Sequence, residues 1–152
     1  MLRDYDEPDC AVAKALAIFG DRWTLLIVRE AFFGTRRFAD FEARLGISKN
    51  VLTKRLTHLV EHGVLARVEA GRYGARQEYE LTPRGKDLTS VITALRQWGD
   101  RWIFGEGREP LVVLDRATGK PIERLRIRRA DGSEVPAQDL ELRPGPATRS
   151  KS

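Results

Sequence analysis

The chain has 152 residues and a formal net charge of +5, a length typical of one domain with a small appendage. No apolar run approaches the roughly 20 residues that span a bilayer, and the acidic start does not resemble a secretory signal, so we expect a cytoplasmic protein without membrane contact. The single cysteine, Cys10, excludes an internal disulfide and any multi-cysteine metal site.

The basic excess is concentrated in one part of the chain. Residues 1–34 carry four basic and six acidic side chains, residues 35–76 carry nine and four, and residues 77–152 carry fourteen and twelve. The middle segment alone therefore has a net charge of +5, equal to that of the whole chain. A basic segment within a near-neutral scaffold favours an anionic partner such as DNA.

Helical periodicity begins near residue 10. Apolar residues recur at helical spacing in residues 10–19, and Gly20 is placed to end that helix. Asp21 can cap a second helix, which we expect over residues 23–33 because its apolar positions follow a 3.6-residue period. The apolar surface of this second helix is wide, which predicts burial on more than one side.

The next two predicted helices form a helix-turn-helix. Residues 38–45 are a short amphipathic stretch that ends at Gly46. Ser48 is placed to cap a helix over residues 48–62, which stops at Gly63. Two short helices joined by a tight turn are the helix-turn-helix arrangement. The apolar stripe of the second of them consists of Leu52, Leu56, Leu59 and Val60.

The period then changes from helical to alternating. Residues 64–69 and 77–81 are β-compatible runs separated by a glycine-containing segment, which predicts a hairpin. The dipeptide at 82–83 is a Thr-Pro cap and first-turn pair, from which we expect one long helix to about Phe104.

The last part of the chain predicts a small appendage. Its short apolar runs are separated by tight-turn signals at residues 117–119 and 130–132. The fold class is therefore α+β, mostly α, with a winged helix-turn-helix domain over residues 1–104. We expect a small β appendage over residues 105–143 and a disordered tail over residues 144–152.

The predicted helix over residues 48–62 has a polar face that suits DNA. A helix fits the major groove, where Asn can pair with adenine, Lys can donate to guanine and a Thr methyl can contact thymine. The residues nearest the helix start normally penetrate furthest, so we predict base contacts by Lys49, Asn50, Thr53 and Lys54. We predict contacts to the backbone or the minor groove by Arg36, Arg37, Arg55, His58, Arg72 and Arg76.

Other interpretations of these residues remain open. Solvation alone explains a polar helix face, and ordinary surface arginines or a solvated hairpin explain the remaining cations. The alternative function is a winged-helix module for protein contacts without DNA binding, whose recognition face would usually lack clustered cations. Enzymatic activity is disfavoured because neither Cys10 nor Ser48 has an identifiable base and orienting acid, and because no glycine-rich phosphate loop is present.

Aromatic residues near the helix junction and the appendage indicate a candidate effector pocket. An apolar pocket between them could bind a small aromatic effector, although core packing explains the same residues. The candidate pocket residues are Trp23, Phe32, Phe33, Trp98 and Trp102.

Several motifs together resemble a known family. They are residues 10–13 (CAVA), 20–29 (GDRWTLLIVR), 37–38 (RF), 47–56 (ISKNVLTKRL), 61–64 (EHGV) and 79–85 (YELTPRG). In this order they resemble the MarR-like HxlR-type bacterial transcription regulators, over about residues 8 to 104. The resemblance implies a homodimer, paired through its first and last helices, that places two recognition helices in successive major grooves of a dyad-symmetric operator. It also implies a regulator of transcription, which we expect to be a repressor.

The resemblance also bears on Cys10 and on the appendage. Family members commonly have a cysteine at the position of Cys10, and in some it senses electrophiles or oxidants, whereas a lone helical cysteine is usually a small packed residue. Some relatives end in hairpins that resemble a zinc ribbon with cysteines in two turns. The matching turns here, at residues 115–119 and 128–132, contain no Cys or His, so we expect neither a metal ion nor another cofactor.

Overall fold

The computed structural model describes residues 10–74 and 76–146. The chain divides into two units, Met1–Arg96 and Gln97–Ser152, and each is described by itself. In chain order the labelled elements are α1 (Ala11–Phe19), α2 (Thr24–Phe32), α3 (Phe38–Leu45), α4 (Lys49–Glu61), β1 (Leu65–Ala70), β2 (Arg76–Leu81), α5 (Pro83–Lys86) and α6 (Thr89–Gly99).

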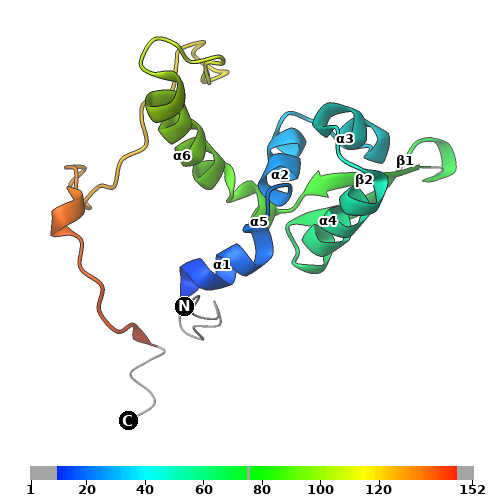
Figure 1. Cartoon of the computed structure of the whole chain (residues 1–152), viewed down its shortest axis with the longest axis horizontal. Coiled ribbons are helices and arrows are strands. Elements are labelled where there is room, and N and C mark those ends of the chain that lie inside the picture. The colour runs from blue at the N-terminus through cyan, green and yellow to red at the C-terminus, as the bar shows by residue number, and fades with distance from the viewer. Residues whose placement is uncertain (1–9, 75, 147–152) are drawn as a thin grey trace. The chain divides into compact units, whose positions relative to one another are not determined.

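The core of the first unit lies between α2, α3, α4 and the hairpin of β1 and β2 (Figure 1). The predicted leucine stripe of α4 is confirmed, since Leu52, Leu56 and Leu59 are at most 1% exposed. Each fully buried side chain of this size contributes about 1.5–3 kcal/mol to stability. The buried cluster consists of Ile27, Val28, Phe41, Ile47, Leu52, Leu56, Leu59, Val64 and Leu65.

The predicted helix ends are confirmed by their capping contacts. The Sγ atom of Cys10 accepts a hydrogen bond from the N–H of Ala13 at 3.4 Å, at the start of α1. The hydroxyl of Ser48 accepts one from the N–H of Val51 at 3.3 Å, at the start of α4. Gly46 has φ +61°, a left-handed conformation that favours glycine and ends α3.

The predicted hairpin is also confirmed. The strands β1 and β2 are antiparallel, with Leu65 opposite Leu81. The N–H of Tyr79 in β2 donates to the backbone carbonyl of Arg36 at 2.8 Å, so the loop before α3 is tied to the sheet as well. A backbone hydrogen bond therefore joins the wing to the loop that precedes α3.

The predicted single helix that extends to Phe104 is interrupted. A turn separates α5 from α6, where the N–H of Leu88 donates to the carbonyl of Gly85 at 3.1 Å, three rather than four residues back. Glycine is a poor helix former, and Gly85 lies too close to the Val64 carbonyl to accept a side chain. After α6 the helical path ends in a π-helical turn, Asp100–Phe104.

The second unit differs from the predicted β appendage in the extent of its strands. In place of strands it has two turns, each closed by an isolated β-bridge, Leu114 with Pro121 and Arg128 with Glu134. The predicted disordered tail, residues 144–152, lies largely outside the described residues. Across the described ranges, no helix is both long and apolar enough to cross a bilayer.

Aspartates hold both turns of the second unit. The carboxylate of Asp115 accepts hydrogen bonds from the N–H of Ala117 at 2.8 Å and from the hydroxyl of Thr118 at 3.1 Å. One carboxylate oxygen of Asp131 accepts from both the N–H and the hydroxyl of Ser133, at 2.9 and 2.6 Å. These bonds from Ser133 hold the pKa of Asp131 below its usual value.

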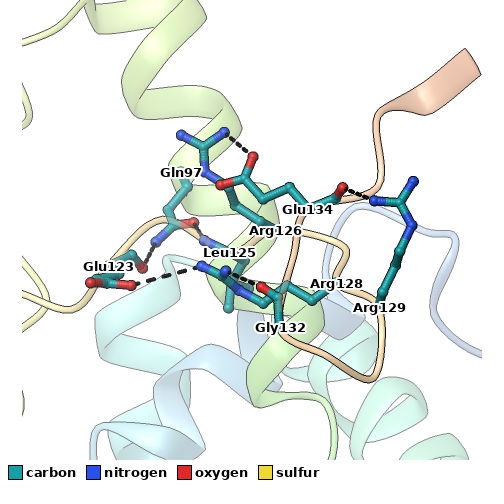
Figure 2. A network of polar contacts seen from close by, with 8 residues as sticks. All are labelled: Gln97, Glu123, Leu125, Arg126, Arg128, Arg129, Gly132 and Glu134. Atoms are coloured by element: carbon teal, nitrogen blue, oxygen red, sulfur yellow. Dashed lines mark hydrogen bonds and ion pairs between the residues drawn. The ribbon is translucent and has the colours of Figure 1, made fainter.

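Side chains of Gln97 and Arg128 bind backbone groups of the segment between the two turns and of the second turn. Figure 2 shows Gln97 of α6, whose amide accepts from the N–H of Leu125 at 2.8 Å and donates to the carbonyl of Glu123 at 3.1 Å. The guanidinium of Arg128 donates to the carbonyl of Gly132 at 2.8 Å. Hydrogen bonds rather than a buried core therefore define this segment.

The close approach at Gly85 predicts a large effect of one methyl group. A Cβ atom there would lie 2.2 Å from the Val64 carbonyl oxygen, so Gly85→Ala should lower the free energy of unfolding by about 3 kcal/mol or more. Gly99 is the matched control, because its Cβ would lie 3.9 Å from the nearest side-chain atom and its backbone is helical. Gly99→Ala should be neutral or stabilising by about 0.5 kcal/mol. Equal urea midpoints for the two variants would contradict this packing.

Candidate nucleic-acid interface

The first half of α4 presents a free polar face. The buried leucines fix the rotation of the helix about its axis, and this leaves Lys49, Asn50, Thr53 and Lys54 exposed. Within the described part of the chain, the side chains of Lys49, Asn50 and Lys54 make no hydrogen bond or ion pair. The hydroxyl of Thr53 donates to the carbonyl of Lys49 at 2.8 Å, so its methyl group remains available to a partner. The structure therefore brings the four predicted base-contacting residues together on one exposed face.

The second half of α4 is held by the junction of α1 and α2. Arg55 is partly buried, with its Nε atom 3.5 Å from an Asp21 carboxylate oxygen. The Nε2 atom of His58 lies 2.7 Å from the backbone carbonyl of Ile18, and its ring lies against that of His62. Both side chains were predicted to contact phosphates, but the structure gives each of them a partner within the protein.

Asp21 connects α2 to α4. Its carboxylate accepts hydrogen bonds from the N–H groups of Trp23 and Thr24, at 2.8 and 3.1 Å, and from the Thr24 hydroxyl. Burial by itself raises the pKa of Asp21, but these hydrogen bonds and the charge of Arg55 outweigh it and lower the pKa. Asp21 therefore caps the turn that leads into α2, whose N-cap residue is Trp23 rather than the predicted Asp21, and it also pairs with Arg55.

The tip of the hairpin carries two free arginines. Arg72 and Arg76 are exposed, and neither forms an ion pair within the described residues. Tyr73 lies at the tip with φ +59° and is 97% exposed. A Cβ atom on Gly71 would lie 3.2 Å from the Nε atom of Arg76, so glycine leaves room for that guanidinium.

Arg36 and Arg37 are turned toward β2. The Nε atom of Arg36 donates to a Glu78 carboxylate oxygen at 2.9 Å, and its terminal nitrogen pairs with Glu80. The Nε atom of Arg37 lies 3.5 Å from the other oxygen of Glu78. Burial opposes the charged form of Arg36, but the two glutamates outweigh it and raise its pKa. These two arginines join the α2–α3 loop to the wing, and their predicted contacts with phosphates stay a prediction.

One basic residue of the surface was missed by the sequence reasoning. Arg67 of β1 is exposed, and its terminal nitrogen donates to the hydroxyl of Thr57 on α4 at 3.4 Å. This contact places a further cation beside the polar face of α4. Its only sequence signal is an arginine within a strand, and the contact with Thr57 depends on the tertiary packing of β1 against α4.

A cavity of the first unit includes one of the residues predicted to line an effector pocket. A cavity of about 540 Å³ lies in the first unit, and of the predicted residues of that unit Phe32 lines it, whereas Trp23 and Phe33 do not. Trp98 and Trp102 belong to the second unit. No cluster of three or more potential metal ligands occurs among the described residues.

Known proteins support the assignment made from the motifs. A family model for HxlR-like helix-turn-helix proteins matches residues 18–106. The chain belongs to the HxlR-like helix-turn-helix family. Its fold is that of a winged helix-turn-helix, and members of this HxlR family are DNA-binding transcription regulators.

Individual HxlR relatives extend the similarity beyond the family domain. The HTH-type transcriptional regulator Rv3095 of Mycobacterium tuberculosis (strain ATCC 25618 / H37Rv) is 39% identical, over 93% of this chain and 89% of its own length. The crystal structure of PA1607, described as a candidate transcription factor, is 41% identical with a TM-score of 0.85, covering 91% of this chain and 97% of that one. The reduced form of the transcriptional regulator YodB from Bacillus subtilis is 26% identical with a TM-score of 0.54, covering 61% and 93% of the two chains.

The role of Asp21 in this HxlR-type domain predicts a pH-dependent stability. Asp21→Ala should lower the free energy of unfolding by about 1–2 kcal/mol at neutral pH, because the α2 cap and the partner of Arg55 are both lost. Since the pKa of Asp21 is lowered in the folded protein, this difference should be complete above the unfolded-state pKa of about 4 and should disappear as the pH falls through the folded-state value.

The control for Asp21 is another acidic residue of the same unit. Glu61 is exposed at the end of α4 and makes no ion pair in the described part of the chain, so Glu61→Ala should change stability little at any pH. Denaturant unfolding of the three proteins between acid and neutral pH measures the effect. A constant difference between wild type and Asp21→Ala down to strongly acid pH would contradict the role given to this carboxylate.

Proposed function

We propose that the protein is a dimeric, sequence-specific repressor that reads a dyad-symmetric operator with α4 and contacts the DNA backbone or minor groove with the wing. The observation that carries the proposal is the distribution of free and paired cations on the basic segment. Cations at the start of α4 and at the hairpin tip form no ion pair within the described residues. Other cations of the segment, such as Arg36, Arg37 and Arg55, form ion pairs with acidic residues of the protein.

Acidic residues separate the two kinds of cation. Arg36 forms ion pairs with Glu78 and Glu80, and Arg37 forms one with Glu78. Arg55 forms an ion pair with Asp21. Within the described residues of the basic segment 35–76, the cations without an acidic partner are Lys49, Lys54, Arg67, Arg72 and Arg76. Cations that need not break an internal ion pair can bind phosphate at lower cost, and their displacement of counterions makes DNA binding salt-dependent.

Base recognition is assigned to the start of α4. The exposed amide of Asn50 has the donor and acceptor that adenine requires, and Lys54 can donate to guanine. Lys49 and Thr53 lie on the same exposed face. The wing arginines are assigned no base contact. They bind the phosphate backbone or enter the minor groove, where its width rather than a particular base favours them.

A second copy of the chain is supported by the apolar residues that the protein exposes. Val12 and Leu16 of α1 and Leu95 and Trp98 of α6 are all exposed. Exposed apolar residues that recur along helices are typical of surfaces that pack against another protein chain. A dimer bound at a promoter blocks polymerase sterically, so repression requires no further contact.

Cys10 is a candidate site for redox control of this repressor. It is partly buried, and its Sγ atom accepts the N–H of Ala13 at the start of α1. The relative YodB has been solved both in a reduced form and after diamide treatment. Oxidation of Cys10 would remove the cap of α1, and α1 holds His58 of the recognition helix through the Ile18 carbonyl.

Variants of α4 and of the wing test the proposed recognition. Asn50→Ala and Lys54→Ala should each lose about 1–3 kcal/mol of binding free energy on the selected operator and much less on random DNA. Arg76→Ala should weaken binding to both DNAs by similar factors and reduce the salt dependence of binding. Fluorescence anisotropy with a site obtained by binding-site selection measures these losses.

The matched control is Arg44→Ala, because Arg44 of α3 belongs to the same basic segment and is paired with Glu30 at 3.8 Å. The effect of this variant on DNA affinity should be no larger than its effect on stability explains. For the wild type, two chains should bind each operator. Equal losses on operator and random DNA for Asn50→Ala would refute base reading by α4. Binding of a protein partner with no measurable DNA affinity would favour the protein-contact module.

The redox proposal has its own test. Treatment with diamide or a quinone should modify Cys10 and lower the operator affinity of the wild type several-fold, with recovery on reduction. Cys10→Ser keeps a capping side chain and should bind DNA with or without oxidant. Mass spectrometry that finds Cys10 unmodified, or unchanged binding by the modified protein, would exclude redox control at this residue.

A further inference from the structure

The cavity of about 540 Å³ in the first unit has walls of two kinds. It lies where the end of α2, the loop before α3, β2 and the segment from α5 to α6 meet. Small-molecule sites in proteins typically enclose a few hundred Å³ and combine apolar walls with a few polar groups. The cavity therefore has the size and the composition of a ligand site.

Its apolar wall carries two aromatic rings. Phe32, Tyr79 and Leu81 line this side, and all three are only partly buried. The Tyr79 ring also contacts the buried Phe41 of α3 edge to face, with centroids 6.4 Å apart. A flat ring inserted beside Phe32 and Tyr79 would cover exposed apolar surface and could stack on either aromatic.

Its polar wall has an excess of one positive charge. Lys86 is exposed and forms no ion pair within the described ranges, whereas Arg36 is already bound to Glu78 and Glu80. Of the lining residues, Lys86 and Arg36 are cationic and Glu80 is anionic. A ligand with one negative charge would neutralise this wall, and its first partner would be Lys86.

Two hydroxyl groups add hydrogen-bonding capacity. Thr35 is 6% exposed, and among the described residues its hydroxyl has no hydrogen-bond partner, which is costly for a buried polar group. The Thr89 hydroxyl donates to the Lys86 carbonyl at 2.6 Å, which leaves its oxygen free to accept. Both residues line the cavity.

We propose that this cavity binds an aromatic monocarboxylate of one or two rings, and that the bound ligand lowers the affinity of the protein for DNA. The carboxylate binds Lys86, and the ring packs on Phe32 and Tyr79. A neutral or cationic ligand of the same shape would leave Lys86 unpaired and would bind more weakly.

The effect on DNA binding follows from what Arg36 holds in place. Its backbone carbonyl accepts from Tyr79 at 2.8 Å, and its guanidinium pairs with Glu78 and Glu80, so it ties the α2–α3 loop to the wing. A carboxylate in the cavity competes with Glu80 for this guanidinium and loosens the connection between wing and helix-turn-helix. This step rests on the DNA binding proposed above, whereas ligand binding does not.

Calorimetric titration of the full-length protein tests the site. The probes are 2-naphthoate, benzoate and the neutral 2-naphthamide, and 2-naphthoate should bind at least about tenfold more tightly than the amide. Lys86→Gln should remove most of this difference. Thr89→Trp, which fills the cavity from an exposed position, should abolish binding, and circular dichroism should show that this variant is folded. Lys120→Gln, in the second unit, is the charge-matched control and should bind as the wild type does.

The outcomes distinguish specific binding in this cavity from nonspecific attraction of the carboxylate to surface cations. Equal binding by wild type, Lys86→Gln and Thr89→Trp, equal affinity for naphthoate and naphthamide, or no binding at all would overturn the proposal. Loss of binding in Lys86→Gln and Thr89→Trp, with the control unchanged, would support it.

A second measurement tests the regulatory effect. Saturating 2-naphthoate should weaken operator binding by the wild type several-fold and leave Thr89→Trp unaffected. Asn50→Ala should lose operator affinity and still bind naphthoate, so failure of DNA binding and failure of ligand binding are distinguishable. Naphthoate that binds the cavity without changing operator affinity would refute its role as an effector.

Discussion

Burial of one leucine stripe determines what α4 can present to a partner. With Leu52, Leu56 and Leu59 in the core, rotation of the helix about its axis is fixed, and the side chains on its opposite face must point outward. The far half of the helix is then held by Asp21 and by the Ile18 carbonyl. Core packing and these two polar contacts together therefore fix the orientation of the exposed face of α4.

Features set by local chemistry could be predicted from the sequence. The cap at Ser48, the end of α3 at Gly46 and the hairpin depend on neighbours within a few residues, and all of them are confirmed. The partners of Arg36 could not be predicted, because Glu78 and Glu80 lie more than 40 residues away and reach it only through the packing of β2. The close approach of Gly85 to the Val64 carbonyl likewise arises from tertiary packing and has no local sequence signal.

The net charge of the basic segment conceals this division of roles. Some of its cations serve the fold, because acidic residues from other segments neutralise them, and the remainder are free for a partner. A charge count along the sequence locates the basic segment but cannot separate the two groups. Tertiary ion pairs separate them, and they distinguish the unpaired cations at the start of α4, at the hairpin tip and at Arg67 from the paired ones.

Carboxylates hold both turns of the second unit. Asp115 and Asp131 satisfy the backbone and hydroxyl groups of their own turns. The second turn is sensitive to acid, because protonation of Asp131 below its lowered pKa weakens the bonds that its carboxylate accepts from Ser133. One exposed side chain thus couples the shape of this turn to the acidity of the surroundings.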